Sequence, residues 1–292
     1  MASSDRPIII GAAVAVLAVA AGLYYYFYVY REAAATAPHA TAALHLPPPS
    51  AASSAPAIEH PLPPSATTGA QALPPLNDSD QPLEGALTAV PGAAPLEKVL
   101  VPQNLVRHIV ATIDNLPRKK VAVELRPIHP TAGEFAVDSA GDHVTIAAQN
   151  YRRYAPVMDI VRATSAQQLA DVYLHFYPLF QQAYEDLGYP SEYFNDRVIE
   201  VIDNLLATPD VKGPIELVQP NVMYLYADPK LESLSAGQKT LIRMGPANEA
   251  LIKDRLRALR AILATHPHAA AHPSSAAASA AQSASAPSSS AP

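Results

Sequence analysis

The sequence predicts a mainly α-helical, membrane-anchored domain of about seven helices with one small β-hairpin. Three observations support this fold class. Residues 8–30 form an apolar run without a charged side chain, apolar residues recur at helical spacing over most of residues 76–264, and residues 135–146 alternate around a turn. The two periods separate helix from strand because a helix turns every 3.6 residues, whereas strand side chains alternate between two faces.

The apolar run at residues 8–30 is long enough to cross a membrane. Twenty-three residues at about 1.5 Å each exceed the roughly 30 Å thickness of the hydrocarbon core. A cleavable signal peptide is the main alternative, with the three alanines at 33–35 as its cleavage site. The tyrosine-rich block before them is too bulky for a cleavage region and suits a membrane interface. We therefore predict an uncleaved, single-pass transmembrane helix.

The charges beside this helix are nearly balanced. One arginine lies on each side, Arg6 before the run and Arg31 after it. Under the positive-inside rule, the free α-amine and the short tail of residues 1–7 favour an amino terminus in the cytoplasm. We therefore expect the rest of the chain outside the cytoplasm, and the inverted topology stays as an alternative.

Four small residues share one face of the predicted transmembrane helix. They are Gly11, Ala15, Ala18 and Gly22. Small residues on one face let two helices approach closely, which would support a homodimer through this segment. An alanine-rich segment also produces such spacings by chance, so both interpretations stay open.

Two segments flank the part of the chain that can build a core. Residues 31–75 are rich in Ala, Pro, Ser and Thr, and residues 265–292 contain no Asp, Glu, Lys or Arg. Such compositions bury too little apolar surface to offset their ordering entropy. We predict a disordered, partly extended linker and a disordered tail around one globular domain at residues 76–264.

The composition argues against several functional classes. The chain has 26 acidic against 20 basic residues, a formal net charge of −6, which argues against nucleic-acid binding. It contains no cysteine, so it has no disulfide, thiolate nucleophile or zinc–thiolate site. No phosphate-binding loop, dinucleotide fingerprint or hydrolase motif occurs in the sequence. We therefore predict no cofactor and no metal site.

The first half of the domain predicts three helices and a hairpin. A short helix is expected within residues 76–90, and a stronger one over residues 96–116, where apolar residues recur at helical spacing. Residues 135–146 predict a β-hairpin around a Ser-Ala-Gly-Asp turn. Helical spacing returns at residues 151–161, where Pro156 is placed to begin the helix.

The next two helices have clear signals. Residues 165–168, Ser-Ala-Gln-Gln, form a capping box that begins the longest helix. We expect this helix to kink at Pro178, which cannot donate a helical hydrogen bond, and to end at Gly188. A further helix is expected at residues 195–206.

The last part of the domain mixes extended and helical signals. Residues 215–226 are β-branched and aromatic with a proline inside, so they predict one or two short edge strands or an extended connector. A second capping box at residues 235–238 begins a short helix that ends at Gly245, and the final helix is expected at residues 247–264.

A long stretch of sequence resembles one known family. Residues 194–246, FNDRVIEVIDNLLATPDVKGPIELVQPNVMYLYADPKLESLSAGQKTLIRMGP, are similar to the signature of the bacterial domain-of-unknown-function 3014 family. The upstream segments NLVRHIVATIDNLPR and YPLFQQAYEDLGYP are similar to further parts of it, so the resemblance spans about residues 76–263. It implies a proteobacterial protein with one amino-terminal membrane span, and it implies no reaction and no functional residue.

An acidic stripe and a basic stripe are the candidate interaction residues of the domain. The acidic stripe is Asp196, Glu200 and Asp203, and the basic stripe is Lys253, Arg257 and Arg260. Three carboxylates are able to ligate a divalent cation, but one helix face rarely encloses an ion, so a solvated flank is the simpler interpretation. The basic stripe would bind an acidic partner or anionic lipids, or would pair with the acidic stripe inside the domain.

The sequence favours a non-catalytic role. We expect a single-pass inner-membrane protein that presents its helical domain to the periplasm for interaction with an envelope protein. The first alternative is an enzyme that acts on cell-wall or envelope material, with Glu185 or Asp196 as general acid or base. The second alternative is a membrane tether whose domain faces the cytoplasm.

Overall fold

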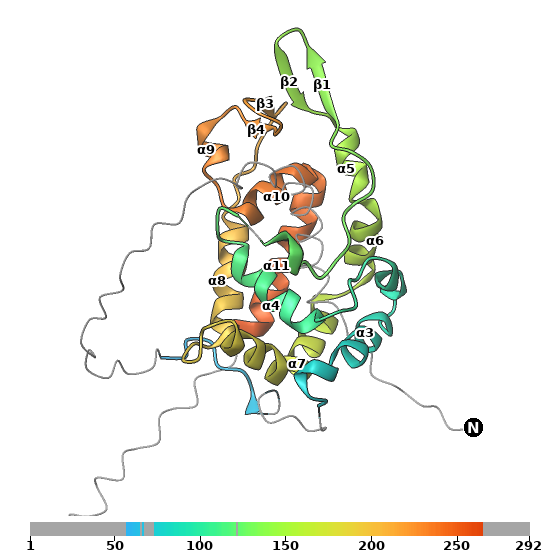
Figure 1. Cartoon of the computed structure of the whole chain (residues 1–292), viewed down its shortest axis with the longest axis vertical. Coiled ribbons are helices and arrows are strands. Elements are labelled where there is room, and N and C mark those ends of the chain that lie inside the picture. The colour runs from blue at the N-terminus through green and yellow to red at the C-terminus, as the bar shows by residue number, and fades with distance from the viewer. Residues whose placement is uncertain (1–56, 65, 67–72, 121, 265–292) are drawn as a thin grey trace, which may run out of the picture.

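A computed structural model describes residues 57–64, 66, 73–120 and 122–264 (Figure 1). These residues form nine α-helices and a four-stranded antiparallel sheet, so the fold is mainly α-helical as predicted. The helices are α3 (Asp80–Thr88), α4 (Leu105–Asn115), α5 (Gln149–Arg153), α6 (Ala155–Ala163), α7 (Ala166–Asp186), α8 (Phe194–Leu206), α9 (Pro229–Glu232), α10 (Ala236–Met244) and α11 (Pro246–Ala264). The strands are β1 (Val137–Ala140), β2 (His143–Ile146), β3 (Glu216–Val218) and β4 (Leu225–Tyr226). Three short 3₁₀ helices are η2 (Leu76–Asp78), η3 (Ala94–Lys98) and η4 (Val123–Leu125).

The described chain has two more α-helices than the seven expected. The helix predicted at residues 151–161 is divided at Tyr154, because α5 ends before it and α6 begins after it with Pro156 in its first turn. Helix α9 is a single short turn that sequence periodicity does not reveal. Its amino end is capped by the side chain of Asp228.

The prediction of one helix over residues 96–116 is wrong for the first half of this range. Only the 3₁₀ helix η3 forms there, and α4 begins at Leu105. Asn104 has a left-handed backbone conformation with φ of 52°, through which a right-handed helix cannot continue. The side chain of Asp80 accepts hydrogen bonds from the backbone N–H groups of Asn104 and Leu105, at 2.8 and 2.7 Å. A carboxylate from α3 therefore fixes where α4 begins.

Helix α7 begins at the predicted capping box. The Ser165 hydroxyl accepts from the backbone N–H of Gln168, and the Gln168 side chain accepts from the backbone N–H of Ser165. The helix continues through Pro178 to Asp186, and the chain turns away at Gly188, whose φ is 117°. Only glycine adopts that angle without steric cost.

Helices α4, α7, α8 and α11 pack against one another around the main hydrophobic core (Figure 1). Helix α3 lies against α4 and α7 and adds Leu83 and Leu87 to this core. Tyr177, Tyr184 and Phe194 are the largest side chains that are fully buried in it. Each large apolar side chain that leaves water in this way stabilises the fold by about 1.5–3 kcal/mol.

The small sheet lies at one end of the helices and has its own core (Figure 1). The strand order is β1-β2-β3-β4, and every neighbouring pair is antiparallel. Strands β1 and β2 are the predicted hairpin, and β3 and β4 show that residues 215–226 contain strands. Leu217 is paired with Val144 on one side and with Tyr226 on the other, and this face packs with Ile242 of α10.

Gly245 lets the sheet end approach the helices closely. It follows α10 with φ of 87°, and α11 begins at the next residue. A Cβ atom at this position would lie 2.5 Å from the ring of Tyr151 in α5. Glycine is therefore required by the backbone angle and by the neighbouring ring.

No helix among the described residues is long and apolar enough to span a membrane. The anchor predicted at residues 8–30, with its small-residue face, lies outside the described residues. The same holds for the predicted tail at residues 265–292 and for most of the linker predicted at residues 31–75.

Candidate functional site

A pocket of about 380 Å³ lies where the end of α7 and the beginning of α8 meet the last turn of α4. Ala57 and Glu59, which are far away in the sequence, also line it. Among its lining residues are three tyrosines and one arginine, Arg197. Five other lining residues carry carboxylates, so acidic groups predominate: Glu59, Asp114, Glu192, Asp196 and Glu200.

Asp114 is the buried charge of this pocket, with only 4% of its side chain exposed. Arg118 donates to its Oδ2 at 2.6 Å, and Arg197 donates from Nε to its Oδ1 at 3.1 Å. Arg197 also donates from Nη2 to the Asp114 carbonyl at 2.7 Å, and the Tyr189 hydroxyl accepts from Arg118 at 2.7 Å. Because a buried carboxylate is tolerated only when it is paired, this cluster ties the last turn of α4 to the beginning of α8.

Two stacked tyrosines form the wall next to Asp114. The rings of Tyr184 and Tyr189 lie 4.5 Å apart at an angle of 20°. The Tyr184 hydroxyl donates to Oε2 of Glu192 at 2.9 Å. Two effects raise the pKa of Tyr184 above its ordinary value: burial, which is the larger, and this hydrogen bond. The hydroxyl therefore stays protonated and acts as a donor.

Residues 57–62, which we call the docked segment, are held at the first turn of α8. The backbone N–H groups of Glu59 and His60 donate to the two carboxylate oxygens of Asp196, at 3.0 and 2.7 Å. The backbone N–H of Leu62 donates to the Tyr193 hydroxyl at 3.1 Å. Asp196 therefore recognises two consecutive main-chain amides and no side chain of the segment.

A buried asparagine completes this contact. Asn195 is fully buried, and its Nδ2 donates to the carbonyl of His60 at 2.8 Å. The Tyr173 hydroxyl donates to Oδ1 of Asn195 at 3.2 Å, which fixes the orientation of the amide. Leu62 is only 7% exposed and belongs to the main core. Residues within the segment predicted as a linker therefore pack against the domain.

The structure gives each residue of the acidic stripe a different partner. Asp196 binds the docked segment, and Glu200 accepts from Arg197 at 2.6 Å. Asp203 accepts two hydrogen bonds from Arg260 of α11, at 2.6 and 2.8 Å. The three carboxylates do not converge, and no group of three His, Asp or Glu side chains in the described part of the chain is placed to hold a metal ion.

The basic stripe is also divided among different contacts. Arg260 pairs with Asp203 across α8 and α11, as one interpretation of the stripes expects, and Arg257 pairs with Asp254 of its own helix at 2.6 Å. Lys253 is buried, and its Nζ lies 2.7 Å from Oε1 of Glu249.

Lys253 also connects α11 to the carboxyl end of α8. Its ammonium donates to the Thr208 carbonyl at 2.6 Å and to Asp210 at 2.7 Å. Burial raises the pKa of Glu249, and the opposing effect of Lys253 is smaller. The Asp210 side chain is largely exposed, but the Lys253 side chain is buried, so Lys253 is not part of an exposed basic surface.

The two carboxylates named for the enzyme alternative lie in different environments. Asp196 lines the pocket, but both of its oxygens accept hydrogen bonds from the docked segment. Glu185 accepts from Gln181 at 2.9 Å and is not among the lining residues. The arrangement therefore does not bring the two together as an acid–base pair in this pocket.

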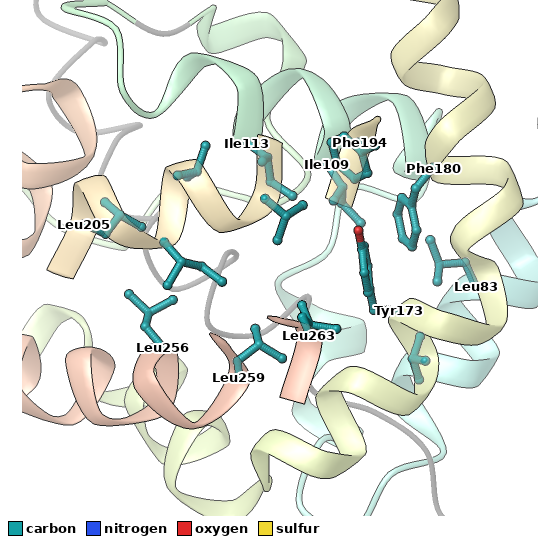
Figure 2. A pocket seen from close by; sticks show the side chains of 14 residues that line it. Leu83, Ile109, Ile113, Tyr173, Phe180, Phe194, Leu205, Leu256, Leu259 and Leu263 are labelled. Atoms are coloured by element: carbon teal, nitrogen blue, oxygen red, sulfur yellow. The ribbon is translucent and has the colours of Figure 1, made fainter. Parts of the chain in front are cut away.

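A second, apolar cavity of about 40 Å³ lies between α4, α7, α8 and α11. Figure 2 shows side chains from these helices and from Leu83 of α3 pointing toward one another around it. Its lining side chains are all buried in the main core. The cavity is much smaller than the roughly 150 Å³ of an engineered cavity that binds benzene. We therefore assign it to the core.

Sequence reasoning missed most of the pocket. Asp114 directly follows the apolar stripe of α4, and Arg197 lies between two residues of the acidic stripe, so neither forms a pattern of its own. The weak signal that was present is Leu62, a large apolar residue between Pro61 and Pro63 in a segment with few such residues.

A comparison with protein families gives one result. The model described as "Protein of unknown function (DUF3014)" matches residues 105–260. The match begins with α4 and ends within α11, and it covers more than half of the chain. No curated protein and no solved structure matches the chain.

Proposed function

The chain belongs to the DUF3014 family, and we propose that it is a single-span inner-membrane protein that presents a non-catalytic helical domain to the periplasm. Its role there is to bind another envelope protein. The anchor is the apolar run at residues 8–30, whose face of Gly11, Ala15, Ala18 and Gly22 would let two copies associate.

One observation carries the proposal of a binding role. The amino end of α8 holds a peptide segment through main-chain hydrogen bonds from Glu59 and His60 to Asp196. Recognition of the main-chain groups of a short segment is a general way in which domains bind peptides. This surface of the domain therefore has the chemistry of a peptide-binding site.

The pocket chemistry supports binding over catalysis. A general acid or base must reach the proton that it transfers. Both oxygens of Asp196 accept main-chain hydrogen bonds, and Glu192 accepts from the Tyr184 hydroxyl. Asp114 is enclosed by two arginines. These carboxylates serve structural contacts.

The composition of the chain suits a domain held away from a membrane. Residues 31–56, between the anchor and the docked segment, keep the proline-rich composition of a spacer. At about 3.1 Å per residue their greatest reach is on the order of 80 Å. A spacer, an anchor and a domain with a peptide-binding surface together support a tethered interaction module.

An envelope-acting enzyme is the second candidate, because the pocket does gather Glu192, Asp196 and Glu200 in one place. The two candidate functions predict different effects of Asp196→Asn on cellular function. An amide is no general acid or base, but its oxygen still accepts a hydrogen bond from the docked segment. Under the binding proposal, cellular function falls only in part, whereas an enzyme would lose it.

Membrane topology is the experiment that tests the proposal. Alkaline phosphatase and green fluorescent protein are fused separately after Pro292 of the full chain. We expect phosphatase activity without fluorescence, because the phosphatase folds in the periplasm and the fluorescent protein does not. Fluorescence without phosphatase activity would overturn the periplasmic location and favour a tether that faces the cytoplasm.

A further inference from the structure

The contact between the docked segment and α8 depends little on the side chains at residues 59 and 60. Asp196 accepts the N–H groups of Glu59 and His60, and Asn195 donates to the carbonyl of His60. These groups are present in any peptide except where proline removes an N–H. A different sequence could therefore make the same three hydrogen bonds.

The proline after His60 makes the segment a suitable ligand. A residue before proline has fewer backbone conformations available to it, so His60 loses less entropy when it binds. Two residues later, Leu62 places its side chain in the main core. The structural requirements of the site are therefore two adjacent amides, a proline and then an apolar residue.

The charge of the docked segment does not suit the pocket. Glu59 lines a pocket that also contains Glu192, Asp196 and Glu200. Arg197 and Arg118 are both directed to Asp114, and Arg197 also pairs with Glu200. Glu59 is exposed, so its carboxylate lies at the edge of a pocket with an excess of negative charge, where like charges repel each other.

We propose that the pocket and the first turn of α8 form a docking site for a short, proline-containing segment of a partner protein, with a basic side chain where Glu59 lies. The docked segment occupies the site until such a partner displaces it. This inference rests on the proposed function as an interaction module, and it names the chemistry of the partner. The basic side chain would lie at the edge of a pocket that is lined by Glu192, Asp196 and Glu200. The stacked rings of Tyr184 and Tyr189 in the same pocket also favour a cation.

Charge also decides between this partner and a second copy of the chain. The same segment from a second copy would bring another glutamate to position 59, so it would meet the same repulsion. A partner with lysine or arginine there gains an attraction in place of a repulsion. The observations therefore favour a different protein as the occupant.

The first test changes the charge of the segment within the full chain. We expect Glu59→Lys to slow hydrogen exchange at the amides of residues 59 and 60 by about fivefold at low salt, after correction for intrinsic rates. Glu59→Gln, which removes the repulsion without adding an attraction, should give an intermediate effect. High salt should reduce the difference. Equal or faster exchange in Glu59→Lys would overturn the role of charge.

The second test measures binding of free peptides to the full chain in a non-ionic detergent. The double variant Glu59→Pro/His60→Pro removes both amide donors and opens the site, whereas Glu59→Ala/His60→Ala keeps them and serves as the matched control. The labelled peptides are AIEHPLPP, which copies residues 57–64, and AIKHPLPP, in which lysine replaces the glutamate.

The proposal predicts a specific order of affinities. The opened chain should bind AIKHPLPP about tenfold more tightly than AIEHPLPP at low salt, and the control variant should bind both more weakly. Adding Asp196→Ala to the opened chain should abolish binding. Equal binding of the two peptides, or binding that survives Asp196→Ala, would contradict the proposal. Tighter binding of AIEHPLPP would point to a second copy as the occupant.

Folding of the opened chain is checked by circular dichroism. If the opened chain does not fold, the test is run on the wild-type chain, where AIKHPLPP should still displace the docked segment and speed exchange at His60. Failure of both displacement and binding would overturn the docking site. A periplasmic or cytoplasmic result from the fusions does not affect these assays, so the failures of the two proposals are distinguishable.

Discussion

Helix α8 contacts buried charges at both of its ends, but the two arrangements differ in what surrounds them. At its amino end, Asp114 and Arg197 lie beside an open pocket, and Asp196 binds main-chain amides of a distant segment. At its carboxyl end, the buried ammonium of Lys253 contacts Glu249 and the Thr208 carbonyl, and it also pairs with the exposed Asp210. We call the first the open end, because it lies beside the pocket, and the second the closed end, because the Lys253 and Glu249 side chains are buried.

This difference distinguishes a site that binds a ligand from a charge pair that stabilises the packing of the fold. Lys253 and Glu249 are both buried and belong to the same helix, so an external group could not take the place of either without disrupting the packing around α11. The ligand of Asp196 is a short segment that approaches from the surface. We infer that the open end is where the domain interacts, although both ends contain residues of the sequence-predicted stripes.

The largest effect is expected at the closed end. Lys253→Met leaves the buried carboxylate of Glu249 without its partner and should lower the free energy of unfolding by about 3–5 kcal/mol. The double variant Lys253→Met/Glu249→Leu removes both charges and should recover most of this loss. Denaturation by urea, followed by circular dichroism, measures both. A double variant as unstable as the single one would show that the pair is not coupled.

A smaller effect on stability is expected from substitution of Asp114 at the open end. Asp114→Asn weakens the contacts to Arg118 and Arg197 and should lower the free energy of unfolding by about 2–3 kcal/mol, as expected for buried, charged hydrogen bonds. Asp159→Asn is the matched control, because its pair with Arg162 is exposed on both sides. The control should change stability by less than about 0.5 kcal/mol. Similar losses in both variants would remove the distinction between buried and surface pairs.

The docked segment should contribute about as much to the free energy of unfolding as one core side chain does. Leu62→Ala should cost about 2 kcal/mol, since Leu62 is buried in the main core. Ile58→Ala is the control within the same segment, because Ile58 is exposed and should change stability little. The same urea titration measures both. If Leu62→Ala is as neutral as Ile58→Ala, the segment does not form part of the core.

The smallest effect concerns pH at the closed end. Burial raises the pKa of Glu249 in the folded state, so this group favours folding while it is protonated and loses that contribution as the pH rises through the raised pKa. Above the ordinary value of 4.5, the wild-type chain should therefore lose stability relative to Glu249→Gln. Urea midpoints between pH 4.5 and 7 measure the difference. A constant difference would contradict the assigned pKa direction.

The sequence predicted those parts of the fold that depend on local signals. The capping boxes at Ser165 and Ser235 form as expected, because each joins residues only three positions apart. The hairpin of β1 and β2 is also local. The start of α4 was missed because it depends on Asp80, which reaches Leu105 from another helix.

The candidate site depends almost entirely on distant contacts. Periodicity correctly placed Asp196, Glu200 and Asp203 on one helix, but it could not show that each has a different partner. The proline-rich composition of residues 31–75 predicted disorder, and composition contains no information about Asp196, more than 130 positions away from Glu59. Long-range hydrogen bonds of this kind are not encoded in any local pattern.

The central claim is that residues 57–62 are bound to α8 through their amides, and hydrogen exchange tests it most directly. In the full chain, we expect the amides of Glu59 and His60 to be protected at least about tenfold relative to Asp196→Ala, since the carboxylate is their acceptor. Asp203 lies on the same helix as Asp196, and Asp203→Ala, which breaks its pair with Arg260 of α11, should leave this protection unchanged. Unprotected amides in the wild-type chain, or protection that survives Asp196→Ala, would contradict the account.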